Sequence, residues 1–372
     1  EMMTVFFNGS VQATFFTIKT DDASDDDSIG SRQKRYMKAY RDALMATPAA
    51  PCSAEEMLGW MFTLSPGVGN HTEQTAALGA LAHVDARCPD YLLPMGAGFA
   101  GSSAAALIRT LQLGNNASGP AGLPASTQAA IGRALLNMSA NNATGSLWAF
   151  VNRRANDAIE IDDSENLDLG NKIPVSLALE IVAQLPGPEF GPDLKMPDGH
   201  TVAEHCAAWA RYWRTYFATR ALWGINVETS STSYDKYFIS ELVTMHDLTQ
   251  SAELRALVSD YMQVYYADAA TEYVPGLGTR GGAKSRVYHD HYALSDADSL
   301  GIIGWLLGWA GNSSTPTPGA WGAGSLMHDI VATSMAATSW RPLPQLALIA
   351  RANSHQTTAF VYSTQRLGRA AD

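Results

Sequence analysis

The 372-residue sequence is short of cysteine, of positive charge and of long apolar runs. Its three cysteines, Cys52, Cys88 and Cys206, form no CxxC pair, which excludes a zinc knuckle and a disulfide-dense scaffold. A Cys52–Cys88 bridge and free thiols both stay open. No uncharged apolar run reaches the ~18 residues of a membrane-spanning helix, so no membrane partner is expected. The net charge of −11 argues against a nucleic-acid partner, which needs a basic face.

The chain also starts without the pattern of a signal peptide. Glu1-Met2-Met3 is not a charged segment followed by an apolar stretch, so we expect a processed N-terminus. Asn-x-Ser/Thr sequons, which mark surface loops of secreted glycoproteins, are frequent. They begin at Asn8, Asn70, Asn116, Asn137, Asn142 and Asn312. The sequons predict a secreted, N-glycosylated protein.

Apolar residues make up 46% of the chain, and from about Gln33 onward they recur at the three-to-four spacing of amphipathic helices. Clusters of Gly, Pro, Asn and Asp separate the helical segments. The predicted helices are Lys34–Met45, Ala54–Phe62, Glu73–Asp85, Ser102–Leu113, Ser126–Met138, Leu147–Asn156, Lys172–Gln184, Val202–Leu222, Ser233–Leu248, Ala252–Tyr273, Ser295–Leu307 and Ser325–Met335. Strand signals are confined to Thr357–Ser363, which is β-branched and aromatic.

These elements predict an all-α fold with little β structure. Sequential antiparallel pairs with long loops favour an α/α toroid or incomplete barrel of about six to seven helical hairpins. A superhelical α-solenoid is the alternative, but the chain lacks the readable repeat that solenoids carry. We expect an irregular N-terminal segment over 1–33, with an acidic loop at Asp21–Asp27, and one catalytic domain over 34–372.

Two polar segments break the helical pattern. The first runs from Trp223 through Glu228 and several hydroxyl residues to Tyr234 and Tyr237, and it leads into a new helix. The alternative explanation is purely structural: the loop caps the following helix and its tyrosines pack in the core. The second is Thr279–His291, where Arg280, Lys284 and Arg286 follow one another around a Gly-Gly turn. Such a loop suits the bidentate gripping of carboxylates, although an ordinary basic surface loop gives the same pattern.

A third segment, Glu160–Lys172, is acidic and contains Ser164-Glu165-Asn166. It lacks the Gly turn and terminal Glu of an EF-hand loop, so it predicts no calcium site. His289 and His291 flank the basic loop, but two histidines without a third ligand are a weak metal signal. We therefore expect no metal and no other cofactor.

Together the three segments resemble the α/α-toroid polysaccharide lyases, the alginate-lyase and heparinase-II/III-like superfamily, and most closely polysaccharide lyase family thirty-eight. The resemblance rests on Ser164-Glu165-Asn166, on Glu228 followed by Tyr234 and Tyr237, and on Arg280-Gly-Gly-x-Lys-Ser-Arg-x-Tyr288. It covers about residues 140–310. Relatives often carry His after the Asn, where this chain has Leu167, and many continue into a C-terminal β-domain.

The resemblance implies cleavage of a 4-linked uronic-acid polymer, mannuronan-type alginate or glucuronan, by metal-independent β-elimination. Neutralising the sugar carboxylate makes the C5 proton removable, and a tyrosine then serves as base and as acid. The catalytic residues implied are Tyr234, Asn166, Tyr288, Arg286, Glu228 and His289. The substrate-binding residues implied are Arg280, Lys284, Glu165, Tyr237, Trp223 and His291.

Two other functions stay open at the level of sequence. A glycoside hydrolase on the same kind of toroid would use paired carboxylates, and Glu228 with Asp163 or Glu165 supplies candidates. A non-catalytic polysaccharide-binding protein would need only the basic and aromatic residues. In each case the expected partner is an acidic polysaccharide and the expected state is a monomer.

Overall fold

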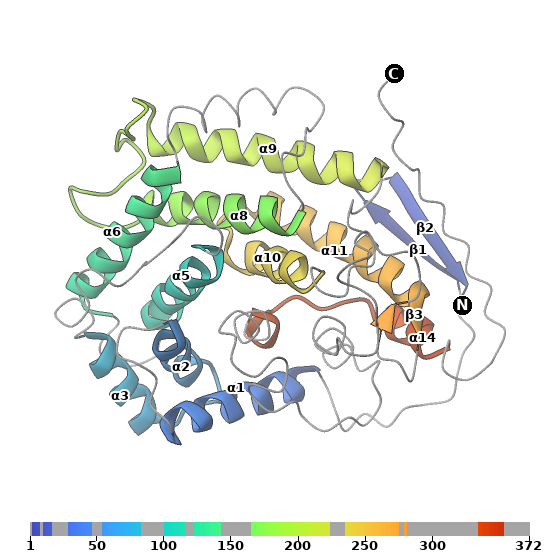
Figure 1. The fold of residues 1–372 in the computed structure, drawn as a ribbon, viewed down its shortest axis with the longest axis horizontal. Coiled ribbons are helices and arrows are strands. Elements are labelled where there is room, and N and C mark those ends of the chain that lie inside the picture. Colours follow the sequence, from blue (N-terminus) through green and yellow to red (C-terminus); the bar gives the residue numbers. More distant parts are fainter. Residues whose placement is uncertain are drawn as a thin grey trace, which may run out of the picture.

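The computed structural model describes residues 2–7, 10–16, 29–46, 54–82, 100–116, 123–142, 165–223, 235–274, 279–280 and 334–352. Within them, helices dominate and strands form only two short antiparallel hairpins (Figure 1). The helices are α1 (Ile29–Ala46), α2 (Ala54–Leu64), α3 (His71–Ala82), α5 (Ala100–Asn116), α6 (Ala125–Asn142), α8 (Glu165–Val182), α9 (Val202–Trp223), α10 (Asp235–Leu248), α11 (Ala252–Glu272) and α14 (Pro344–Ala352). The expected all-α class is confirmed.

Most predicted helices that fall on described residues are present, with ends shifted by a few positions. The predicted helices 147–156 and 295–307 and the predicted strand 357–363 lie outside the described residues, as does most of 325–335. Helix α14 was not predicted, because its nine residues, which begin at Pro344, give too short a periodic run. Its buried residues Leu346, Ile349 and Ala350 nevertheless form one helical stripe.

The N-terminal segment differs from the irregular structure expected over 1–33. Strands β1 (Met2–Phe7) and β2 (Ser10–Phe16) pair as an antiparallel hairpin, and α1 already begins at Ile29. The sequence signal was Asn8-Gly9 between two β-branched and aromatic runs, which is a strong short hairpin pattern. Both strands contact α11, so the hairpin packs on the helical body.

Helix α8 begins seven residues before the expected start at Lys172 and continues through Pro174. Proline inside a helix loses one hydrogen bond and costs about 3 kcal/mol. Leu169, Ile173 and Leu177, spaced four apart, are each no more than 1% exposed. Burying three such side chains contributes roughly 1.5–3 kcal/mol each, which outweighs the proline cost. Glu165 and Asn166 therefore lie in the first turn of α8, not in a segment before a helix that starts at Lys172.

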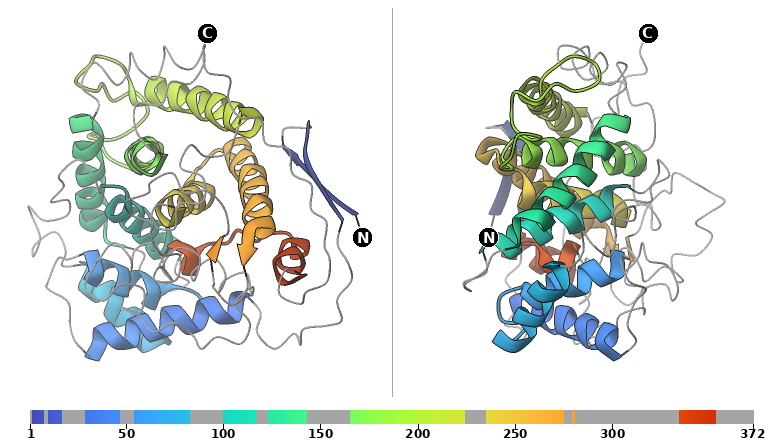
Figure 2. Two further views of the ribbon diagram at one scale, coloured as in Figure 1. Left: turned by 45° about the vertical axis from the view of Figure 1, so that its right-hand side comes forward. Right: turned by 90° about the vertical axis from the view of Figure 1, so that its left-hand side faces the viewer.

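Helix α10 occupies the centre of the described structure. Every residue from Phe238 to Met245 is buried, and the helix contacts α5, α8 and α11 (Figure 1). A helix surrounded on all sides is normally apolar all round, and Ser240, Glu241 and Thr244 are buried polar exceptions in α10. Figure 2 shows α10 enclosed by these neighbours from a second direction.

A ladder of aromatic side chains joins α9 to the core. Trp209, Tyr212, Trp213, Tyr216 and Phe217 are at most 2% exposed, and neighbouring rings lie 5.0–6.0 Å apart. Such ring pairs stabilise a fold beyond their buried area. Trp209 and Trp213 therefore serve the core.

Two helices begin with reciprocal capping boxes. At α3, Asn70 Oδ1 accepts from the Glu73 amide at 3.0 Å while Glu73 accepts from the Asn70 amide at 2.8 Å. Thr201 and Glu204 repeat the arrangement at the start of α9. Each box satisfies two amides that a helix N-terminus otherwise leaves unpaired.

Among the predicted glycosylation sites, Asn70 is exposed, and Asn137 in α6 is exposed as well.

Gly132 in α6 lies against the turn that follows α8. A Cβ at this position would lie 2.5 Å from Leu185 Cδ1 and 2.8 Å from Phe190 Cζ. Gly132→Ala is therefore expected to lower the free energy of unfolding by about 1–3 kcal/mol, measured by urea denaturation. Gly79→Ala in α3, where a Cβ meets nothing within 4 Å, is the control and should be neutral or stabilising. Equal effects of the two substitutions would contradict this packing argument.

Candidate functional site

The predicted site residues divide into two groups. Tyr234, Tyr288, Arg286, Glu228, His289, Lys284 and His291 lie outside the described residues. The other five have a described backbone position in a helix or strand. Glu165 and Asn166 open α8, Trp223 closes α9, Tyr237 lies in the first turn of α10, and Arg280 lies in β4 (Thr279–Arg280).

Contacts between helices fix how these positions are related. Helix α8 is hydrogen-bonded to α9 at two points. Lys172 Nζ of α8 donates to Tyr212 Oη of α9 at 3.0 Å, and Ser176 Oγ of α8 accepts from Trp213 Nε1 of α9 at 3.1 Å. At the far end of α8, Glu180 accepts from Thr249 and from the Gln250 amide, just after α10. The C-terminal ends of α8 and α10 therefore meet, and because the two helices also pack directly against each other, they run in the same direction with their N-termini at the same end (Figure 1).

Helix α11 returns along α10. The Phe238 and Tyr265 rings, from the start of α10 and the second half of α11, lie 5.1 Å apart. Strand β3 (Tyr273–Val274) follows the last residue of α11 directly, and Tyr273 pairs with Arg280 in β4. The start of α8, the start of α10 and the β3–β4 hairpin thus share one end of this helical group (Figure 1). We call this the α8/α10 N-terminal end.

A buried carboxyl group lies in α10 one helical turn after Tyr237. Glu241 is 7% exposed, and burial raises its pKa to about 8. Its Oε2 has no hydrogen-bond partner among the described residues. Glu241 was not among the predicted site residues, although its position among Phe238, Leu242 and Met245 on a helix marks it as a core carboxyl.

The raised pKa makes Glu241 a source of pH-dependent stability. Because the folded-state pKa exceeds the unfolded value, its contribution is complete below about pH 4.5 and is lost as the pH rises towards 8. Glu241→Gln, which stays neutral, should therefore show a flatter dependence of unfolding free energy on pH between 5 and 8. Urea unfolding at several pH values measures this, and parallel curves for the two proteins would rule the effect out.

Two of the described histidines, His205 and His246, contact an aspartate. His205 Nε2 lies 3.1 Å from Asp198 Oδ2, and both side chains are at most 3% exposed. His246 Nδ1 lies 3.0 Å from Asp247 Oδ1. Cys206 is a free thiol whose pKa is raised to about 12 by burial and by Glu180, so it stays protonated. The described residues contain no group of three or more His, Cys, Asp and Glu side chains suited to a metal ion.

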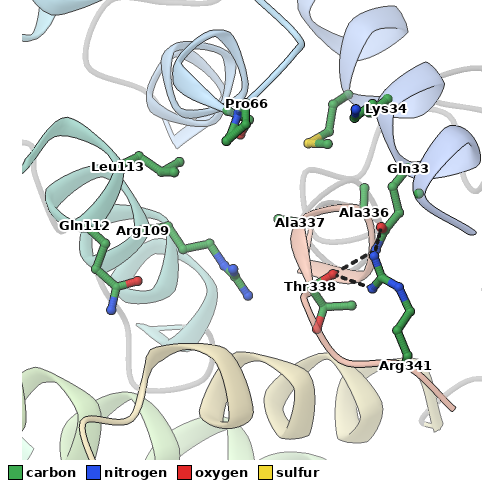
Figure 3. A pocket seen from close by; sticks show the side chains of 13 residues that line it. Gln33, Lys34, Pro66, Arg109, Gln112, Leu113, Ala336, Ala337, Thr338 and Arg341 are labelled. Carbon is green, nitrogen blue, oxygen red and sulfur yellow. Dashed lines mark hydrogen bonds between the residues drawn. The ribbon is translucent and has the colours of Figure 1, made fainter. Parts of the chain in front are cut away.

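A second feature, a cavity of about 280 Å³, lies between α1, α5 and the segment 334–341 (Figure 3). Lys34, Arg109 and Arg341 contribute three cationic side chains to its wall, and Gln33, Gln112 and Thr338 contribute neutral polar groups. None of the described lining residues is acidic. No sequence pattern indicated this cavity, because its lining residues come from separate parts of the chain, of which Gln33 and Thr338 are 305 positions apart.

Behind the cavity wall, Arg109 forms a buried ion pair. Its Nη2 donates to Asp247 Oδ2 at 2.9 Å, and the two side chains are 9% and 6% exposed. Asp247 also accepts from the Ser339 amide and hydroxyl at 3.1 and 2.8 Å. This network ties α5, α10 and the segment before α14 together. Its signal in the sequence was an arginine between the buried residues Ile108 and Thr110.

The fold defines an all-α protein. Comparison with protein-family models, with curated proteins and with solved structures finds no match to this chain. None of the described helices is long and apolar enough to cross a membrane.

Proposed function

We propose that this protein is a polysaccharide lyase that cleaves a 4-linked uronic-acid polymer by β-elimination. The observation that carries the proposal is the basic segment Arg280-Gly-Gly-Ala-Lys284-Ser-Arg286-Val-Tyr288 in a chain of net charge −11. It begins in β4, at the α8/α10 N-terminal end, where the Ser164-Glu165-Asn166 motif and Tyr237 also enter their helices. Motifs that are far apart in the sequence can form a single site only if they lie at the same end of the helical group.

In the proposed reaction the site first weakens the bond between C5 and its hydrogen. The Asn166 amide, assisted by Arg280 or Arg286, neutralises the carboxylate next to C5, so that negative charge can develop there as the proton leaves. Tyr234 removes the C5 proton and then donates a proton to the departing O4, with Tyr288 as the alternative. In mannuronate and glucuronate, C5–H and O4 lie on the same side of the ring, which lets one tyrosine do both.

The remaining candidates would hold the polymer. Lys284 grips a neighbouring sugar carboxylate, Trp223 and Tyr237 supply ring faces, and Glu228 orients a cation or donates a hydrogen bond when protonated. His289, His291 and Glu165 complete the candidate set beside the two motifs. The bond that forms is the C4–C5 double bond, and the bond that breaks is C4–O4.

The proposal is tested by incubating the protein with purified mannuronan, glucuronan and mixed alginate. A lyase creates an unsaturated uronate at each new end, so absorbance near the ultraviolet band of a conjugated carboxylate should rise with new reducing ends. New reducing ends without that absorbance would identify a hydrolase instead. A neutral glucan should give neither signal.

A further inference from the structure

The cavity between α1, α5 and segment 334–341 is a separate feature from the proposed lyase site. Its Arg109 pairs with Asp247, one residue before the C-terminal end of α10, whereas Tyr237 and the proposed site lie at the opposite end. A 14-residue helix is about 20 Å long, so the two places lie about that far apart along α10.

Several donors in the cavity are left without a partner. Arg109 Nε is buried and has no hydrogen-bond partner within the described part of the chain. Lys34 and Gln112 likewise make no hydrogen bond or ion pair with described residues. A Cβ placed on Gly67 would lie 3.4 Å from Lys34 Nζ, so the ammonium sits beside the turn at Pro66 on the cavity rim. Lys34 is exposed and Gln112 is half-buried, so of these three side chains only Arg109, which is 9% exposed, carries the cost of about 1–3 kcal/mol of a buried unpaired donor that a ligand can recover.

The opposite wall is held in place by its own contacts. Gln33 Nε2 donates to the carbonyls of Met335 and Thr338 at 3.1 and 2.9 Å, while Gln33 Oε1 accepts from Arg341 Nη2 at 2.8 Å. Figure 3 shows Arg109 reaching across the cavity towards Thr338 on this wall. The guanidinium of Arg109 is therefore fixed from behind by Asp247 and faces a preformed space. Preformed donors bind a ligand at a smaller cost in entropy.

From these contacts we infer that the cavity binds a small organic anion through its carboxylate or phosphate group. The oxyanion accepts from Arg109 and pairs with Lys34, and Gln112 donates or accepts at the remainder of the ligand. The volume of about 280 Å³ lies just below the usual range for drug-sized ligands, which favours a ligand of about one sugar ring. Of the three cations only Arg109 contacts Asp247, and none of the described lining residues is acidic, so the cavity keeps a positive potential in an acidic protein.

The test is isothermal titration calorimetry of the full chain at low salt with four probes: glucuronate, glucose 6-phosphate, inorganic phosphate and uncharged glucose. Either sugar anion is expected to bind, and glucose is not. The carboxylate and phosphate arms identify which oxyanion is preferred, and binding of inorganic phosphate alone would show that the sugar ring contributes nothing. Binding should weaken as salt is raised, because screening reduces the attraction.

Lys34→Gln is expected to weaken anion binding about tenfold, as the loss of one charge-assisted contact does. Lys38→Gln, one turn along the same exposed face of α1, is the matched control and should change the affinity less than twofold. The inference fails if glucose binds as well as the anions, if Lys34→Gln leaves the affinity unchanged, or if none of the probes binds. Loss of the proposed lyase activity would leave this result untouched, since Tyr234→Phe should bind the anion normally.

Discussion

Replacing Tyr234 with Phe is expected to lower kcat for uronan elimination by about 10²–10⁴-fold while the protein stays folded. The proposed role of Tyr234 is proton transfer at C5 and O4, and a positioned acid or base contributes roughly that factor. Phe keeps the ring and its packing, so KM should change much less than kcat. The measurement is the initial rate of ultraviolet absorbance on the preferred uronan, with the urea unfolding midpoint taken alongside.

Two comparisons sharpen this result. Tyr40→Phe removes a hydroxyl from a ring that packs edge-on against Phe62 in the α1–α2 pair, 5.3 Å between centroids, and should leave kcat unchanged. Tyr288→Phe tests the alternative assignment. If Tyr234→Phe keeps more than half of the activity while Tyr288→Phe loses it, the proton-transfer role belongs to Tyr288. If both keep it, the mechanism is wrong.

Asp247→Asn is expected to have the largest effect on stability, a loss of about 3–5 kcal/mol at pH 7. Burial favours the neutral form of Asp247, but the Arg109 charge and hydrogen bonds from His246, Arg109 and Ser339 prevail and lower its pKa to about 2. The variant leaves the Arg109 guanidinium buried without its carboxylate, and removing one partner of a buried pair costs about this much. Urea unfolding measures the loss.

The pH dependence of the unfolding free energy gives a second test of the Arg109–Asp247 ion pair. Because the folded-state pKa of Asp247 lies below the ordinary value of 3.8, its stabilisation is complete above about pH 4. The stabilisation is lost as the pH falls towards 2. The difference between the parent protein and Asp247→Asn should therefore shrink over that acid window. A difference that stays constant down to pH 2 would mean that the carboxylate charge is not its source.

Asp42→Asn provides the matched control on an exposed pair. Asp42 contacts Lys38 and Arg41 at 2.7 Å, but its side chain is 49% exposed. Solvent screens such pairs, so the expected loss is at most about 1 kcal/mol. A double variant, Arg109→Met with Asp247→Leu, removes both buried charges and should cost less than Asp247→Asn alone. If Asp247→Asn costs no more than Asp42→Asn, the ion pair does not hold these helices together.

The sequence determined the local elements of this protein. Apolar spacing and capping residues act within one or two turns, so the helices from α9 to α11 begin and end within two residues of their predicted limits. The same local logic failed where burial overrode it, as in the passage of α8 through Pro174. The prediction for the N-terminus was also wrong, because an irregular segment was expected although Asn8-Gly9 indicates a hairpin.

For the proposed site, the sequence supplied the residue types and the motifs, and the structure relates only some of them. Asn166, Tyr237 and Arg280 belong to elements that share one end, because α8 and α10 run in the same direction and α11 returns along α10. The apolar pattern of one helix does not determine the direction in which that helix runs relative to another. The positions of Tyr234 and Tyr288 lie outside the described residues, so their roles stay predictions.

What only the tertiary structure decided is which polar groups became buried and what they face. Arg109 and Asp247 are 138 residues apart, and Gln33 and Arg341 are 308 apart, yet each pair forms a contact within 3 Å. Hydrophobic periodicity says which side of a helix turns inward, but it carries no information on which other helix meets that side. Helix packing makes that choice, and with it the central place of α10, the protonated Glu241 and the cationic cavity.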